Sequence, residues 1–152
     1  MDKDFFVQEI DAHLGVLYRV AFTLLRNDED CKDAISEATL KAWEKRHTLR
    51  DESRFKAWMI RILSNTCYNI LRKRKRMVYL DEIPEPSISP PDPSLDMALS
   101  SLPEKYRLPI MLFYVEGMQY SEIAEAMHLP LTTIRGRIYV AKDMLRKELQ
   151  CD

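Results

Sequence analysis

Apolar residues recur at helical spacing along three segments in the first half of the chain. The apolar positions of residues 3–25 are Phe6, Ile10, Leu14, Leu17, Ala21 and Leu24. Those of residues 28–46 are Ala34, Ile35, Ala38, Ala42 and Trp43. Those of residues 54–76, with one threonine among them, are Phe55, Trp58, Met59, Ile62, Leu63, Thr66, Ile70 and Leu71. Spacings of three and four predict a bundle of three or four amphipathic helices, with Asn27 and the three acidic residues after it capping the second.

Prolines separate this bundle from the rest of the chain. Five of the eight prolines fall in the sequence EIPEPSISPPDP, which also holds two serines and no basic residue. Such a segment cannot continue a helix and favours extended geometry, and a structureless loop of this length is uncommon inside one compact domain. We therefore predict a flexible, Pro-rich acidic linker at residues 77–93, between a first domain at residues 1–76 and a second at residues 94–152.

The second domain contains the pattern of a helix-turn-helix at residues 119–138, QYSEIAEAMHLPLTTIRGRI. Its first helix is predicted to place Ile123, Ala124 and Met127 inward, and residues 128–130, His-Leu-Pro, form the turn. The next helix carries two neighbouring stripes, about 100° apart. The apolar stripe is Ile134, Ile138, Ala141 and Leu145, and the polar stripe is Arg135, Tyr139, Lys142 and Arg146.

The polar stripe suits DNA. In a helix-turn-helix the start of the second helix meets base edges, whereas cations further along contact phosphates. The predicted base readers are Thr132, Thr133, Arg135 and Gly136, and the predicted phosphate contacts are Arg137, Lys142 and Arg146. The alternative for this segment alone is an amphipathic helical hairpin with a solvated basic face.

The third helix of the first domain ends in five consecutive basic residues at positions 72–76. Such a run often serves only as a solvated helix end, where cations complement the helix dipole. Here, however, the preceding exposed face offers groups that bond phosphates or bases and stack on an unpaired base, namely Arg61, Asn65, Tyr68 and Asn69. Together with Arg72 and Lys73 they favour nucleic acid, and the polar loop at residues 46–53 is suited to cup an extruded base.

The net charge of −1 is unexpected for a free-standing DNA-binding protein, but it averages three different segments. Residues 1–76 have a net charge of +4, residues 77–98 of −5, and residues 99–152 of 0. The charge is therefore distributed by segment, with the excess of cations confined to the first domain.

The scattered cysteines and histidines predict neither a metal site nor a disulfide framework, and no catalytic motif or phosphate-binding loop is found. We expect no enzymatic activity, no cofactor and no metal. The acidic N-terminus and the lack of a long apolar run argue against secretion and membrane insertion, which predicts a cytoplasmic protein.

Three blocks of sequence, in order, resemble the extracytoplasmic-function (ECF) group of bacterial sigma-70-type sigma factors. They are DCKDAISEATLKAWEKR at residues 30–46, FKAWMIRILSNTCYNILRKRKR at residues 55–76, and LPEKYRLPIMLFYVEGMQYSEIAEAMHLPLTTIRGRI at residues 102–138. The resemblance implies an all-α fold, with a region-two helical bundle and a region-four helix-turn-helix domain joined by the linker. It also implies a non-enzymatic subunit that directs core RNA polymerase to specific promoters and opens them.

The resemblance also implies partners for each block. The first would dock on the clamp helices of core polymerase through Asp30, Asp33, Glu37, Leu40 and Lys41, although Ser36 and Thr39 depart from the family pattern. The second would melt and read the downstream promoter element, with the loop at residues 47–54 capturing a flipped base. Its contacts would be Arg61, Asn65, Tyr68, Asn69, Arg72 and Lys73.

The third block would bind the upstream promoter element and the polymerase flap. Its DNA contacts would be Thr132, Thr133, Arg135, Gly136, Arg137, Tyr139 and Lys142. Three positions depart from the common pattern, with His128 and Thr132 in place of glycine and Val140 in place of arginine. The resemblance further implies an anti-sigma factor, which would hold the cytoplasmic chain at the membrane.

Two other functions compete with this one. A free-standing helix-turn-helix regulator would need two-fold pairing to read half-sites, and the sequence shows no heptad seam or further helix after Leu149 to supply it. A protein-binding adaptor would leave the basic run and both DNA-like faces without a purpose. The sigma factor is therefore the preferred hypothesis.

Overall fold

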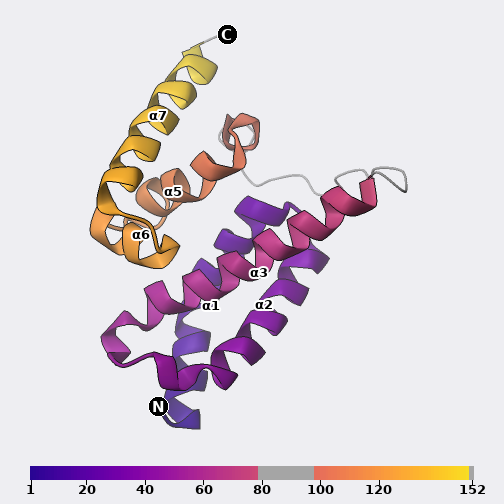
Figure 1. The fold of residues 1–152 in the computed structure, drawn as a ribbon, viewed down its shortest axis with the longest axis vertical. Helices are drawn as coiled ribbons and strands as arrows, with labels where there is room; N and C mark the ends of the chain where they lie inside the picture. The colour runs from indigo at the N-terminus through magenta and orange to yellow at the C-terminus, as the bar shows by residue number, and fades with distance from the viewer. Residues whose placement is uncertain (79–97, 151–152) are drawn as a thin grey trace. The chain divides into compact units, whose positions relative to one another are not determined.

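The structure, a computed structural model, describes residues 1–78 and 98–150, and in these ranges it holds helices and no strand (Figure 1). The chain divides into two compact units, Met1–Ser87 and Ile88–Asp152. The predicted all-α class is confirmed. From position 79 onwards the predicted linker lies outside the described residues, whereas residues 77 and 78 still belong to the third helix.

The first unit contains α1 (Lys3–Leu25), α2 (Asp28–Glu44) and α3 (Phe55–Val78), close to the predicted ranges. Each helix packs against the other two, and Figure 1 shows α3 running alongside both α1 and α2. The predicted N-cap of α2 is confirmed, because the Asp30 amide donates a 3.0 Å hydrogen bond to the side-chain oxygen of Asn27. Between α2 and α3 the chain forms two short 3-10 turns, Arg46–Thr48 and Glu52–Arg54.

The core of the first unit follows the predicted stripes, with one error. The spacing places Leu14 on the apolar stripe of its helix, but the structure leaves this side chain 46% exposed. Helical spacing gives the orientation of a residue around the axis, but it does not say how far the neighbouring helices extend over that face. The pattern also missed residues that are fully buried between the helices, namely Val20, Cys31, Ile60 and Cys67.

The second unit contains α5 (Glu104–Tyr114), α6 (Tyr120–Met127) and α7 (Leu131–Gln150). Its core confirms the predicted apolar stripe of α7, with Ile134, Ile138 and Ala141 fully buried. The Gln119 amide donates a 3.2 Å hydrogen bond to the Glu122 carboxylate, as part of a capping box at the start of α6. Among the described helices, none is long and apolar enough to cross a bilayer.

The turn between α6 and α7 forms at the predicted residues. His128 ends α6 in the left-handed conformation, with φ of 57°. Its amide and that of Leu129 donate hydrogen bonds to carbonyls of the last turn of α6, 3.3 Å to Glu125 and 3.0 Å to Ala124. Pro130 precedes α7 and its carbonyl accepts a 3.1 Å bond from the Ile134 amide. Histidine tolerates this backbone at modest cost, so the turn is formed without the usual glycine.

Candidate nucleic-acid interface

The side chains predicted to dock polymerase lie on one exposed face of α2 and along its edge. Asp33, Glu37 and Leu40 follow the spacing i, i+4, i+7 and form one exposed face, on which Leu40 is 67% exposed. The buried side of α2 is made of small residues, namely Cys31, Ala34, Ala38 and Ala42. Asp30 and Lys41 lie at the edge between these two faces, which is the edge that meets α3.

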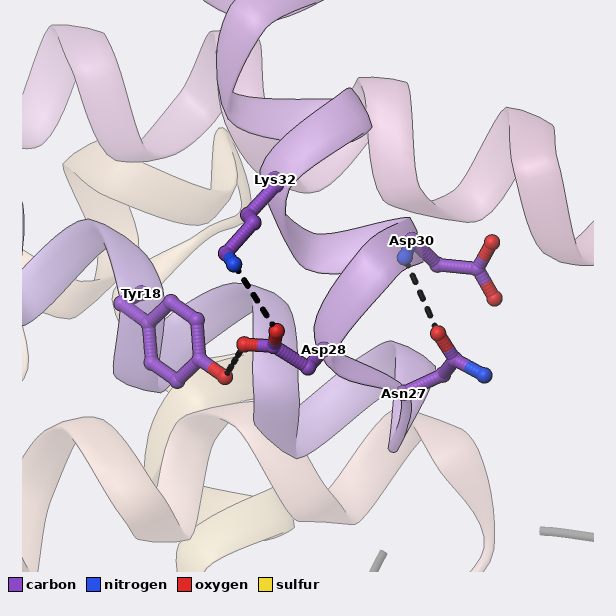
Figure 2. Close-up of polar contacts among 5 residues, drawn as sticks. All are labelled: Tyr18, Asn27, Asp28, Asp30 and Lys32. Atoms are coloured by element: carbon purple, nitrogen blue, oxygen red, sulfur yellow. Dashed lines mark hydrogen bonds and ion pairs between the residues drawn. The ribbon is translucent and has the colours of Figure 1, made fainter. Parts of the chain in front are cut away.

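Asp30 is engaged within the protein. Its carboxylate forms an ion pair with Arg74, a member of the basic run at the end of α3. Figure 2 shows the Asp30 carboxylate pointing away from the cluster formed by Tyr18, Asp28 and Lys32 at the start of the same helix. The beginning of α2 is thus tied to α3 on one side and to α1 on the other.

The tie to α1 is a polar cluster that the sequence did not reveal (Figure 2). The Tyr18 hydroxyl donates a hydrogen bond to the Asp28 carboxylate, whose other oxygen lies 3.1 Å from the Lys32 ammonium. The hydrogen bond to Asp28 raises the pKa of Tyr18 to about 12. The same bond, with help from Lys32, lowers the pKa of Asp28. These contacts fix the orientation of α2 against α1 at the first turn.

A groove of about 350 Å³ runs between α2 and α3, and it contains several predicted site residues. Its lining is Lys41, Lys45, Ile62, Asn65, Thr66, Asn69 and Arg72. The lining has three cations, two amides and no carboxylate, and the Arg72 guanidinium donates a hydrogen bond to the Asn69 side chain. Lys45 was not among the predicted site residues, although it follows Lys41 by four positions, at the C-terminal cap of α2.

The predicted DNA contacts on α3 differ in how far their side chains are exposed to solvent. Asn65, Asn69, Arg72 and Lys73 are exposed, as an interface requires. Arg61 and Tyr68 are only half-buried rather than fully exposed. The predicted face therefore combines four exposed side chains with two that are partly buried.

The loop before α3 is ordered by its own side chains. The Asp51 carboxylate accepts hydrogen bonds from the Ser53 amide at 3.0 Å and the Ser53 hydroxyl at 2.7 Å, which lower the pKa of Asp51. The Trp58 indole donates a 3.1 Å bond to the Thr48 hydroxyl. Beside this loop lies a hollow of about 390 Å³, lined by Phe5, Glu9, His13, Glu52, Ser53, Phe55 and Lys56.

In the second unit most of the predicted DNA contacts at the start of α7 are exposed. Thr132, Arg135, Gly136 and Tyr139 are exposed, Tyr139 by 76%, while Thr133 and Arg137 are half-buried. A Cβ atom on Gly136 would meet no atom of the described chain within 4 Å. Glycine destabilises a helix by about 1 kcal/mol relative to alanine. Because the described chain leaves room for a side chain at position 136, packing within this unit does not explain why a glycine is found there.

Further along α7 the cations are engaged by the protein itself. The Lys142 ammonium lies 4.8 Å from the ring centroid of Phe113 and 5.6 Å from that of Tyr114. The Asp143 carboxylate binds Arg146 and Lys147, each at 3.1 Å, and the two partners lower its pKa. Lys142 and Arg146, in the second half of the predicted stripe, therefore already have intramolecular partners.

Comparison with known sequences supplies the class of protein. Residues 10–77 match sigma-70 region 2 and residues 93–145 match sigma-70 region 4. The ECF RNA polymerase sigma factor SigW of Bacillus subtilis is 27% identical over 98% of this chain and 91% of its own length. The RNA polymerase sigma factor SigV of the same organism is 31% identical over 97% of this chain and 92% of its own length.

Solved structures agree with this class. The sigma factor RpoE of Bartonella quintana, in complex with the anti-sigma factor NepR, has a TM-score of 0.85 and 28% identity, covering 99% of both chains. CnrH, in complex with the cytosolic domain of CnrY, has a TM-score of 0.71 and 25% identity, covering 97% of this chain and 88% of CnrH.

The chain belongs to the sigma-70 family, in its ECF group. It is an RNA polymerase sigma factor that directs transcription initiation, and it is not an enzyme. The resemblance that the sequence blocks indicated, and the fold and function implied by it, are confirmed.

Proposed function

We propose that this sigma factor docks on the clamp helices of core RNA polymerase through the exposed face of α2. Asp33, Glu37 and Leu40 form the centre of that surface, with Asp30 and Lys41 at its edge. A leucine that is 67% exposed and flanked by carboxylates supports a partner that is both apolar and basic. Because α1 and α3 hold α2 at both sides of its first turn, the surface is presented in one orientation.

The downstream promoter element is proposed to bind along α3. Asn65, Asn69 and Arg72 line the groove beside α2, and Arg61, Tyr68 and Lys73 complete the contact set. Amides bond base edges and cations bond phosphates, so a melted strand gains contacts that offset lost pairing and stacking. The hollow beside the loop at residues 46–53 is proposed to receive an extruded base, for which the half-buried rings of Phe5 and His13 offer stacking surfaces.

The upstream element is proposed to bind at the start of α7. Thr132, Thr133, Arg135 and Gly136 would meet base edges, with Arg137, Tyr139 and Lys142 beside the phosphates. The exposed Gly136 supports close approach of DNA to the helix backbone. Lys142 must leave the rings of Phe113 and Tyr114 to reach a phosphate, so we assign it the weakest contact of the set.

Initiation by this protein is proposed to use binding free energy alone, with both units engaging one promoter. Two moderate DNA contacts on one chain reinforce each other through effective concentration, which removes the need for a dimer. The polymerase flap would hold the second unit. An anti-sigma factor is proposed as a further partner, as in the RpoE–NepR complex, and it would keep the protein in the cytoplasm at the membrane until release.

The observation that carries this proposal is the match to region 2 and region 4 in order, with the exposed amides and cations on the corresponding helices. Run-off transcription with core polymerase and a randomised promoter library tests it. We expect transcripts only when the chain is added, from templates that share two separated elements. Tight binding of the chain alone to one duplex, with no effect on polymerase, would instead establish a free-standing helix-turn-helix regulator.

A further inference from the structure

We infer that Lys41 of α2 and Lys45, the residue that caps the C-terminal end of α2, bind phosphates of the promoter strand that faces Asn65 and Asn69. The helix proposed to dock polymerase thereby also holds DNA, on a different side. This inference rests on the proposed location of the downstream element on α3, and it moves Lys41 from the polymerase interface to the DNA interface.

The edge of α2 that meets α3 has two ends of opposite chemistry. At its N-terminal end Asp30 is neutralised by Arg74. At its C-terminal end Lys41 and Lys45, one turn apart, line the groove together with Asn65, Asn69 and Arg72. Leu40, on the docking face, lies about 100° around the helix from Lys41, whereas Glu37, on the same face, lies about 40° from Lys41 and pairs with it. A strand in the groove and a polymerase centred on Leu40 therefore approach α2 from different directions.

The chemistry of the groove suits a nucleic-acid backbone. Its three cations surround two amides, and no carboxylate lies among the lining residues. Lys41 shares its charge with Glu37, whose carboxylate is 3.1 Å from the ammonium. Lys45 forms no ion pair with the described residues, so its charge is available to a ligand. Lysine contributes phosphate affinity without base preference, whereas the amides discriminate bases.

The ion pair between Asp30 and Arg74 supports the groove mechanically. It joins α2 and α3 beyond the groove, in the direction of the α3 C-terminus, so the two lining helices are held together outside the region that DNA occupies. The cations thus face the amides before DNA arrives, which reduces the ordering cost of binding.

The test uses holoenzyme assembled from core polymerase and the full chain, with Lys45→Gln, Lys41→Gln and the double variant. The probe is a forked DNA, taken from a promoter recovered by the run-off selection, with its downstream element single-stranded. Lys32→Gln is the matched control, because Lys32 lies on the same helix, is 70% exposed and pairs with Asp28 outside the groove. The probe affinity is measured against salt concentration, and the affinity of each variant for core polymerase is measured separately.

We expect Lys45→Gln to weaken binding of the fork several-fold at low salt while leaving core affinity unchanged. The slope of log affinity against log salt should become shallower by about 0.7 for each lost single-strand contact, and by roughly 1.4 in the double variant. Lys32→Gln should leave the slope unchanged. Circular dichroism and urea midpoints check that the variants remain folded.

Other outcomes overturn the inference in distinguishable ways. If the lysine variants match Lys32→Gln while Asn65→Ala still slows promoter opening, the lysines do not bind DNA and the proposed site on α3 stands. If Asn65→Ala is also silent, the proposed site on α3 is wrong as well. Loss of core affinity with an unchanged salt slope would return Lys41 to the polymerase interface and would place Lys45 there as well.

Discussion

Asp30 in the first turn of α2 forms an ion pair with Arg74 near the end of α3. The pair divides the basic run at residues 72–76 into a structural member and exposed neighbours, since Arg72, Lys73, Lys75 and Arg76 are all exposed. It also shows that the two interpretations of such a run, a solvated helix end and a DNA contact, are incomplete for this chain. One of the five cations holds two helices together.

Removing either partner is expected to destabilise the first unit slightly. The side chains of Arg74 and Asp30 are 38% and 26% exposed, so solvent screens the attraction, and each alanine variant should lower the free energy of unfolding by about 0.5–1 kcal/mol. Urea denaturation of the full chain measures this, with Lys73→Ala as the exposed neighbouring control. The Asp30→Ala/Arg74→Ala double variant should cost less than the sum of the single variants. Equal effects of Arg74→Ala and Lys73→Ala would show that the pair contributes nothing.

The Tyr18–Asp28 hydrogen bond is expected to make stability depend on pH at both extremes. Tyr18 has a pKa raised from 10.0 to about 12, so its contribution is complete below pH 10 and is lost as the pH rises through 12. Asp28 has a pKa lowered from 3.8, so its contribution is complete above that value and is lost as the pH falls below it.

Tyr18→Phe removes the hydrogen bond to Asp28 and therefore tests the expected loss of stability at both alkaline and acid pH. The difference in urea midpoint between the unmodified protein and Tyr18→Phe should be largest between about pH 5 and 9, and should shrink outside this range. Tyr139→Phe, which removes the hydroxyl of an exposed tyrosine in the second unit, is the control and should leave the midpoint unchanged. A Tyr18→Phe difference that is constant from acid to alkaline pH would contradict the assignment.

The helices were predictable because local periods and caps determine them. The ranges of α1, α2 and α3, the Asn27 cap and the turn at His128 all depend on residues within a few positions of each other. Leu14 was misplaced because its exposure depends on how far other helices extend. The local sequence pattern therefore predicts where the helices begin and end. Which side chains the neighbouring helices bury can be seen only in the packed structure.

Most features of the candidate site required the packed structure too. The ion pair of Asp30 with Arg74 joins two helices that are far apart in the chain, and the groove exists only where α2 crosses α3. Lys142 has the spacing of a DNA contact, yet its ammonium lies over the ring of Phe113 on another helix. Helical spacing identifies the face on which a cation lies but not the partner it finds there.

Substitution of His128 is expected to separate backbone strain from side-chain contacts. His128 is exposed and has φ of 57°, a conformation that costs an ordinary residue about 1 kcal/mol and glycine almost nothing. His128→Gly should therefore stabilise the second unit by about 0.5–1 kcal/mol, and His128→Val should destabilise it by roughly 1–2 kcal/mol. Hydrogen-exchange protection of the α6 and α7 amides measures both. Shifts in the same direction would mean that the imidazole, rather than the backbone, sets the stability.

Arg135 and Arg146 occupy the same polar stripe of α7, but they are expected to behave differently. Arg135 is exposed near the start of the helix, whereas Arg146 is held 3.1 Å from Asp143 near its end. Arg135→Ala should reduce holoenzyme affinity for the preferred upstream element by about 1–3 kcal/mol, the range for an arginine that reads a guanine. Arg146→Ala should have little effect on any promoter, because its charge is already compensated.

Affinity is measured by competition between the preferred promoter and variants with a changed upstream element. An equal loss for Arg135→Ala on all of these sequences would make Arg135 a phosphate contact, and base reading would then fall to Thr132 and Thr133.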